Sequence, residues 1–364
     1  MWKWCGRVLQ TACRELPSES AWAKSRGGVW RGDEDLSLSF CSLIDSSAWL
    51  CYLRLAMTVL ALIAALLLEQ VRPLDNRAML ARVLDAALES LEHHANAGQR
   101  SHGTAAWFIA ILPTLAATLA IYLLLYHVHV LLAWAWNVAV LYLTMGFRQF
   151  SHHFTDIHRA LIDGDLPRAR RLTREWRGRP ADDLNTVEVA RVAIEEAFSA
   201  SHRHVFGVLF WFAFLPGPSG AVFYRLALAL RQRWAEKPAG FGDFAKRAFS
   251  LIDWLPLRLT ATGFAIVGNF EDAVYCWRNQ AHKWRDPELG IVLASGAGAI
   301  GVTLGKPLKE GVTPAGLIID ERAEIGSGDE ADAGFLSSTV GLVWRALVLW
   351  LLLLILLAIA YWVS

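Results

Sequence analysis

The chain has 364 residues, of which 55% are hydrophobic and only 19% are charged. Soluble domains contain about 45–50% apolar and about 25% charged residues. Nucleic-acid-binding domains are usually strongly basic, whereas the formal net charge here is +1. The composition therefore excludes an ordinary soluble enzyme, a nucleic-acid binder, a disordered chain and a small disulfide scaffold. Long apolar blocks and 17 tryptophans instead predict an all-α, multi-pass protein of the bacterial inner membrane, with the lipid bilayer as its partner.

The segment 1–47 differs from the rest of the chain. Its tryptophans follow no helical or strand period, and no apolar run follows its basic residues, so it is not a signal peptide. Most of the cysteines lie in or just after it, at spacings that fit neither a zinc ribbon nor a CxxC pair: Cys5, Cys13, Cys41 and Cys51. We expect a dispensable, disordered leader or an over-extended gene start with Met57 as the initiator. A metal or redox appendage is the alternative.

About four full transmembrane helices are predicted in the remaining domain, 48–364. The first begins at Ala48 or Met57 and ends at Leu68. In the last, Thr339–Val363, fifteen Leu, Ile and Val residues contribute about −7 kcal/mol against a cost of at most ~3 kcal/mol for its single arginine. The second and third follow each other with a tight link and predict a hairpin: Ala105–Tyr126 and Val128–Phe147.

Two polar segments flank this hairpin and are therefore expected on the same side of the membrane. Val71–Thr104 has apolar residues at helical spacing, which predicts an amphipathic surface helix. Arg148–His204 is the most basic segment, so this side is cytoplasmic by the positive-inside rule. Within it we expect helices over Ile157–Leu172 and Asn185–Ser199, the second with a capping box formed by Asn185 and Glu188.

Val205–Leu230 is apolar but is interrupted by the sequence Leu-Pro-Gly-Pro-Ser-Gly at residues 215–220. Each half is about half a bilayer long, which predicts a re-entrant helical hairpin or a strongly kinked span. With a re-entrant hairpin, the C-terminus at Ser364 lies outside. The later segments are expected to be an amphipathic stretch, a small-residue stretch and a polar loop: Ala248–Phe270, Ile291–Leu304 and Lys306–Ser338.

No phosphate-binding loop, HExxH, GxSxG or CxxC motif occurs in the sequence. His152, His153 and His158 share one segment, but only Asp156 adds a ligand type, so a solvated helix is preferred over a metal site. The run His202-Arg203-His204, at the mouth of the broken hairpin, fits a phosphate or carboxylate ligand or an anionic lipid headgroup. The glycines between Gly296 and Gly305 fit close helix contacts better than a ligand.

Three segments in fixed order resemble the CobD/CbiB membrane proteins of cobalamin biosynthesis and their AmpE relatives, from about Met57 to the C-terminus. The first contains Leu209-Phe210-Trp211 and the run Gly220–Arg225. The second is Phe241-Gly242 followed by the run Pro256–Ala261. The third is the glycine-rich run Ala297–Gly305. The resemblance implies a synthase that joins an aminopropanol phosphate to a corrin-ring carboxylate with ATP and Mg²⁺.

The sequence departs from the family pattern where that pattern is acidic. The run that begins with Glu195 continues with Ser199, Ala200, Arg203 and His204 in place of the family's Glu, Asn, Asp and Gly. After Tyr224 and Arg225, the family's Asn, Thr and Asp are Leu228, Ala229 and Arg231. An Asp-Asp pair is Phe249-Ser250, and Leu251–Leu259 resembles the AmpE branch.

The main hypothesis is therefore an AmpE-like sensor, signalling or accessory protein that binds an anionic small molecule or corrinoid. The alternative is a working adenosylcobinamide-phosphate synthase that uses ATP and Mg²⁺. A transporter, suggested only by the broken helix, is a third reading. Apart from the synthase alternative no cofactor or metal is expected, and neither catalytic residues nor a protein partner can be assigned. The candidate ligand-binding residues are Glu195, His202, His204, Tyr224, Arg225, Asp253 and Arg258.

Overall fold

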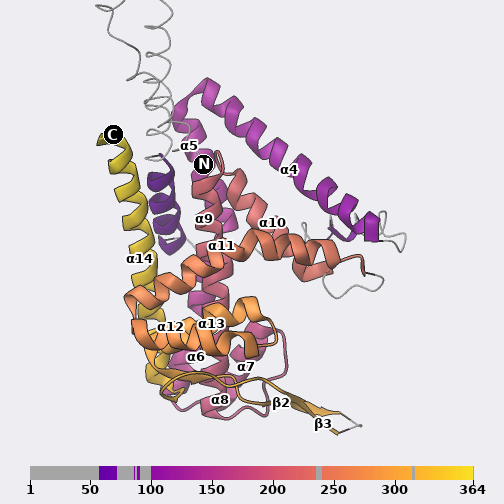
Figure 1. The fold of residues 1–364 in the computed structure, drawn as a ribbon, viewed down its shortest axis with the longest axis vertical. Coiled ribbons are helices and arrows are strands. Elements are labelled where there is room, and N and C mark those ends of the chain that lie inside the picture. The colour runs from indigo at the N-terminus through magenta and orange to yellow at the C-terminus, as the bar shows by residue number, and fades with distance from the viewer. Residues whose placement is uncertain are drawn as a thin grey trace, which may run out of the picture. The chain divides into compact units, whose positions relative to one another are not determined.

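The computed structural model describes residues 57–71, 86, 88–90, 100–234, 240–313 and 316–363. All of them belong to the unit Tyr52–Ser364. The predictions for segment 1–47, and most of the amphipathic helix predicted in Val71–Thr104, lie outside these residues. The described part is predominantly helical, which confirms an all-α membrane fold (Figure 1).

The predicted apolar hairpin is formed by α4 (Arg100–Val128) and α5 (Val130–Thr144). The two helices pack on each other and are joined at His129. Its ring Nδ1 accepts a hydrogen bond from the Leu131 N–H at 3.2 Å, which caps the start of α5. The second helix is shorter than the predicted span Val128–Phe147, because the backbone becomes extended at Met145.

The basic segment predicted to be cytoplasmic forms three helices: α6 (Phe147–Ile162), α7 (Leu166–Arg177) and α8 (Thr186–Ser201). The prediction of a single helix over Ile157–Leu172 is wrong. Gly164 has a φ of 73°, and the Asp165 side chain caps a new helix by accepting from the Arg168 N–H at 3.0 Å. The capping box of Asn185 and Glu188 is confirmed.

A helical hairpin follows α8 without a loop. The chain passes through a π-helical turn, η2 (His202–Phe206), into α9 (Gly207–Phe214), and returns as α10 (Ser219–Trp234). His204 near the start of α9 contacts Arg225 on α10, so the hairpin returns toward the side from which it enters. The helical hairpin and its break at residues 215–218 agree with the predicted interruption of the apolar segment, and its re-entry into the membrane stays a prediction.

Three helices follow this hairpin: α11 (Asp243–Val267), α12 (Phe270–Gln280) and α13 (Pro287–Ile300). A short 3₁₀ turn, η4 (Ala281–Lys283), links α12 to α13. The longest, α11, packs on α13, α10, α14 and α4, and thereby connects the hairpin and α4 to α13 and α14. Large side chains fill the core between these helices: Tyr224, Phe198, Phe264, Phe249 and Trp234 are fully buried.

The predicted polar loop Lys306–Ser338 is only partly irregular. Strand β1 (Val302–Leu304) lies between β4 (Ile325–Gly326) and β5 (Asp329–Glu330), antiparallel to the first and parallel to the second. Strands β2 (Leu308–Thr313) and β3 (Gly316–Asp320) form an antiparallel hairpin. The last helix, α14, already begins at Ala333 and runs to Val363.

Among the described residues, three helices are long and apolar enough to cross a membrane: His102–Val128, Asp243–Val267 and Ala333–Ala360. Two correspond to predicted spans, whereas α11 lies in the stretch predicted to be amphipathic. The other two predicted spans appear as the shorter apolar helices Met57–Val71 and Val130–Thr144.

Glycines determine how closely α9 and α10 approach each other. A Cβ atom on Gly220 would lie 1.9 Å from the backbone oxygen of Trp211, whereas a Cβ on Gly341 of α14 would meet nothing within 4 Å. We expect Gly220→Ala to destabilise the protein by about 1–3 kcal/mol through overpacking, and Gly341→Ala to stabilise it by about 0.5–1 kcal/mol. Thermal unfolding in detergent measures both variants, and equal melting temperatures would contradict the close packing.

Candidate functional site

A buried polar network joins the π-helical turn η2 to the helices α10 and α11. His202 Nε2 lies 3.0 and 3.1 Å from the two carboxylate oxygens of Asp253 on α11. The Tyr224 hydroxyl on α10 donates to the same carboxylate at 2.8 Å. His202 Nδ1 lies 3.0 Å from the hydroxyl oxygen of Thr260. At most 3% of each of these residues is exposed, so the network connects the three helices without reaching solvent.

Both ring nitrogens of His202 have a buried partner. Nδ1 faces the Thr260 hydroxyl, which donates to the Pro256 carbonyl at 2.9 Å, and Nε2 faces the Asp253 carboxylate. His202 and Asp253 therefore form a buried histidine–carboxylate pair, called the buried ion pair below, and such pairing is what ionisable groups among apolar helices require.

The π-helical turn explains why three consecutive basic residues face different surroundings. Such turns insert one extra residue into a helix and occur frequently at functional sites. Here His202 is buried, while Arg203 and His204 are partly exposed. A guanidinium nitrogen of Arg225 contacts His204 Nδ1. Arg203, His204 and Arg225, called the cationic cluster below, therefore lie beside the buried ion pair on η2 and α10.

Glu196, on α8 before this turn, belongs to the same electrostatic environment. Burial raises the pKa of the Glu196 carboxyl above its ordinary value, although the guanidinium groups of Arg203, Arg177 and Arg179 lower it. The neighbouring Glu195 carboxylate raises the pKa of Glu196 as well, so three guanidinium groups and two carboxylates lie close together here. The excess of positive charge favours an anionic ligand.

Glu195 does not join the network around His202. Its Oε1 accepts from the Gly305 N–H at 2.9 Å, and its Oε2 accepts from an Arg322 guanidinium nitrogen. Arg191, one turn earlier on α8, donates to the Gly305 carbonyl at 2.8 Å. Glu195 and Arg191 therefore hold the turn after β1, where Gly305 has a φ of 81°. Their contacts connect α8 to the glycine-rich segment rather than to a ligand.

Lys306 follows Gly305 and also has a positive φ, 66°, which is uncommon for a residue with a Cβ. Its ammonium group lies 3.0 Å from a Glu330 carboxylate oxygen, and this charge lowers the pKa of Glu330. The ion pair joins the turn to β5 and supports the unusual backbone conformation.

Arg258 lies apart from the other candidate residues. Its guanidinium stacks over the Trp254 ring at 4.2 Å and donates to the Trp254 carbonyl at 2.9 Å, on the exposed side of α11. Of the seven candidates, the structure brings together His202, Tyr224 and Asp253, pairs His204 with Arg225 beside them, and separates Glu195 and Arg258 from both groups.

Two acidic residues near the site were missed by sequence reasoning. Asp286, the N-cap of α13, pairs with Arg231 at 2.7 Å, and Glu288 contacts the Ser250 hydroxyl. Arg231 and Ser250 are two of the positions where the family pattern is acidic. Asp286 followed by Pro287 is a helix-start signal, so the sequence indicated the cap but not its neighbours.

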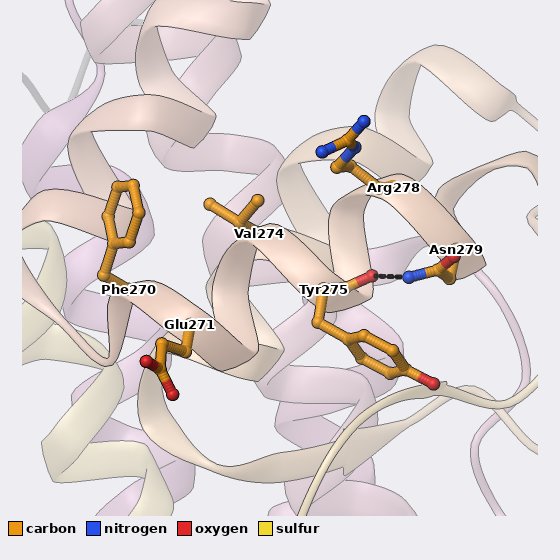
Figure 2. Close-up of a pocket in the computed structure, with 6 residues that line it drawn as sticks. All are labelled: Phe270, Glu271, Val274, Tyr275, Arg278 and Asn279. Atoms are coloured by element: carbon orange, nitrogen blue, oxygen red, sulfur yellow. Dashed lines mark hydrogen bonds between the residues drawn. The ribbon is translucent and has the colours of Figure 1, made fainter.

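The part of the chain that the structure describes contains no group of three His, Cys, Asp or Glu side chains that could hold a metal ion. His152 lies 3.7 Å from Asp156, and His153 stacks on Trp176. Of the histidines considered for a metal, His153 therefore packs against an aromatic ring, and His152 lies near the one carboxylate of the set. A pocket of about 660 Å³ lies along α12 and is lined by Phe270, Glu271, Val274, Tyr275, Arg278 and Asn279 (Figure 2). None of these residues belongs to the network or to the cationic cluster.

Comparison with known proteins covers most of the chain. A family model described as CobD/Cbib protein matches residues 58–331. The chain is 35% identical over 303 residues to the cobalamin biosynthesis protein CobD of Stutzerimonas stutzeri, a match that covers 81% of this chain and 96% of that relative. No solved structure is significantly similar.

Shorter matches involve proteins with the same name. The chain is 40% identical over 171 residues to the relative from Chromobacterium violaceum, covering 46% of this chain and 54% of that one. It is 26% identical over 189 residues to the relative from Leptospira interrogans, covering 49% and 59%. These names do not address the AmpE-like branch, so that assignment stays a prediction.

Proposed function

Because this chain belongs to the CobD/CbiB family, we propose that it acts in cobalamin biosynthesis as an adenosylcobinamide-phosphate synthase of the inner membrane. It would join an aminopropanol phosphate to a carboxylate of the corrin ring. The observation that carries this proposal is the similarity to the Stutzerimonas stutzeri cobalamin biosynthesis protein over 96% of that relative's length. A relationship over nearly the whole length supports a shared pathway better than the sensor hypothesis does.

The cationic cluster is the proposed binding site for the anionic group of the substrate. Guanidinium groups bind phosphate and carboxylate oxygens through paired donors, and Arg225 and His204 are already close to each other. The buried pair of His202 and Asp253 holds the turn from which Arg203 and His204 project. In this proposal His202, Asp253 and Tyr224 are positioning residues, because none of them is accessible to a ligand.

The carboxylates of Asp253 and Glu195 do not fit a Mg²⁺ ion held by the protein. Magnesium is bound through carboxylate oxygens and the phosphates of its substrate. The Asp253 oxygens accept from His202 and Tyr224, and those of Glu195 accept from Gly305 and Arg322. The need for ATP and Mg²⁺ is proposed only because the family's reaction uses them. The residues described here define no reaction step that involves either one.

The second candidate is an AmpE-like binding protein without catalysis. The observation that favours it is the contact between Arg231 and Phe249, whose ring lies beside Tyr224. The Arg231 guanidinium stacks over the Phe249 ring at 5.2 Å, and both residues occupy positions that are acidic in the family pattern. An arginine in place of an acid reverses the local field. This candidate uses the same cationic cluster and differs only in the absence of amide formation.

One experiment separates the two functions. The full chain is expressed in a bacterial strain that lacks the synthase, and growth on cobyric acid is measured together with adenosylcobinamide phosphate formed by the purified protein. Growth and product support the synthase. Protein that inserts in the membrane and binds the corrinoid but forms no product would reject the synthase and support the binding protein.

The cationic cluster is tested by substitution in the same system. We expect Arg225→Ala to weaken binding of aminopropanol phosphate or of the corrinoid about 10- to 100-fold, because a hydrogen bond to a charged group contributes about 1.5–3 kcal/mol. Arg168→Ala, an exposed arginine on α7, is the matched control and should bind normally. Equal affinities of the two variants would remove the cluster from the proposal.

A further inference from the structure

The position of α11 in the membrane is decided by what its two ends contact. Its 25 residues are about 37 Å long, enough to cross a hydrocarbon core of about 30 Å. A helix that crosses the membrane has its ends at opposite surfaces. A helix that lies along one surface has both ends at the same depth.

The first turn of α11 contacts the beginning of α4. The Phe244 ring lies 5.4 Å from the Trp107 ring and 5.7 Å from the Phe108 ring. Just before the helix, the Phe241 carbonyl oxygen would lie only 2.0 Å from a Cβ on Gly103. These contacts fall within the first three turns of α4, next to its cytoplasmic basic end.

The last turns of α11 contact the lower part of α14. A Cβ on Gly263 would lie 3.2 Å from the Trp350 indole nitrogen. Along α14, large exposed apolar side chains begin at Val348, soon after Arg345, which is exposed. Trp350 is five residues beyond Arg345, a rise of about 8 Å. The C-terminal end of α11 therefore meets α14 about 8 Å beyond the charged side chain of Arg345, where the exposed apolar part of α14 begins.

In the topology predicted from the sequence, α4 and α14 both begin on the cytoplasmic side. The packing agrees with this, because α5 packs beside α4 and leads into α6, and both α6 and α8 pack against α14. In Figure 1, α11 runs between α4 and α14 at a steep angle to α14, above α12 and α13. In this topology both ends of α11 lie toward the cytoplasmic end of the apolar helices.

One face of α11 is exposed and apolar although the opposite face is buried. The exposed fractions are 78% for Leu251, 53% for Trp254, 44% for Leu255 and 57% for Ile266. Arg258 lies on the same face, with its guanidinium over the Trp254 ring. Apolar and Trp side chains together with a cation that reaches toward headgroups are typical of helices in the membrane interface.

We propose that α11 lies along the cytoplasmic surface of the bilayer instead of crossing it. Its face of Leu251, Trp254, Leu255 and Ile266 is inserted among the phospholipid acyl chains near the headgroups, and Arg258 binds lipid phosphate. The opposite face carries Asp253 and Thr260, so the buried ion pair with His202 lies at the level of the membrane surface. A substrate from the cytoplasm would then reach the cationic cluster without crossing the membrane.

The test measures depth along the helix. The native cysteines are replaced, with Cys276→Ala at the buried position. Single variants Leu251→Cys, Leu259→Cys and Ile266→Cys are then labelled with a nitroxide spin label. The full chain is reconstituted in vesicles of phosphatidylcholine and phosphatidylglycerol, and the depth of each label is obtained from its collision rates with oxygen and with a water-soluble nickel chelate. Val348→Cys and Ile359→Cys on α14 provide the depth scale.

We expect the three α11 labels to lie within about 5 Å of one another in depth, just below the headgroups. The two α14 labels should differ by about 16 Å, because eleven residues separate them along a crossing helix. A depth change of about 22 Å between positions 251 and 266, the rise over fifteen helical residues, would mean that α11 crosses and would overturn the proposal. Labels fully accessible to the nickel chelate would overturn it as well. Neither result depends on enzyme activity.

Discussion

Replacing Asp253 by alanine is expected to lower the free energy of unfolding by about 3–5 kcal/mol, the usual cost of removing one partner of a buried ion pair. The His202 ring and the Tyr224 hydroxyl would both lose the Asp253 carboxylate as a hydrogen-bond partner while remaining buried. Asp253→Asn keeps the volume and one acceptor oxygen, so we expect a smaller loss.

The measurement is the melting temperature of the purified protein in detergent, which is monitored as the loss of monodisperse protein on heating. We expect a decrease of at least about 5 °C for Asp253→Ala. The matched control is Asp182→Ala, which breaks an exposed ion pair with Arg174 at 3.0 Å and should cost about 0–1 kcal/mol. Similar melting temperatures for both variants would show that the network around His202 does not stabilise the fold.

Glu195→Ala is expected to have an effect of similar size, about 3–5 kcal/mol, for the same physical reason. Only 9% of the Arg322 side chain and 8% of the Glu195 side chain are exposed, so the arginine would stay buried without its closest carboxylate. The Gly305 N–H would lose its acceptor as well. The segment from β1 to β5 should therefore separate from α8 more readily.

Limited digestion with trypsin reports this separation directly, because Arg322, which is followed by Ala323, is a cleavage site within the segment. We expect faster cleavage after Arg322 in Glu195→Ala than in the native protein. Glu330→Ala is the control, since it removes only the exposed partner of Lys306 and should change stability by less than about 1 kcal/mol. Unchanged cleavage in Glu195→Ala would contradict the role assigned to its carboxylate.

The features that the sequence predicted correctly depend on residues close together in the chain. Hydropathy is a sum over adjacent residues, and it predicted α14. The capping box of Asn185 and Glu188 is a contact over three residues. The break in the apolar hairpin at residues 215–218 follows from its prolines and glycine. Even the unforeseen break at Gly164 had a local signal in Asp163-Gly164-Asp165, which the helical spacing of the apolar residues outweighed.

The site itself was decided by tertiary packing. His202 and Asp253 are 51 residues apart, and Glu195 and Gly305 are 110 residues apart. No local pattern determines which carboxylate faces which cation across such separations. The sequence therefore identified Glu195, His202 and Arg258 as a single set. In the structure Glu195 binds the turn at Gly305, His202 pairs with Asp253, and Arg258 lies on the exposed face of α11. Side chains on one helix point in different directions around its axis, and only the neighbouring helices determine which of them become buried and paired.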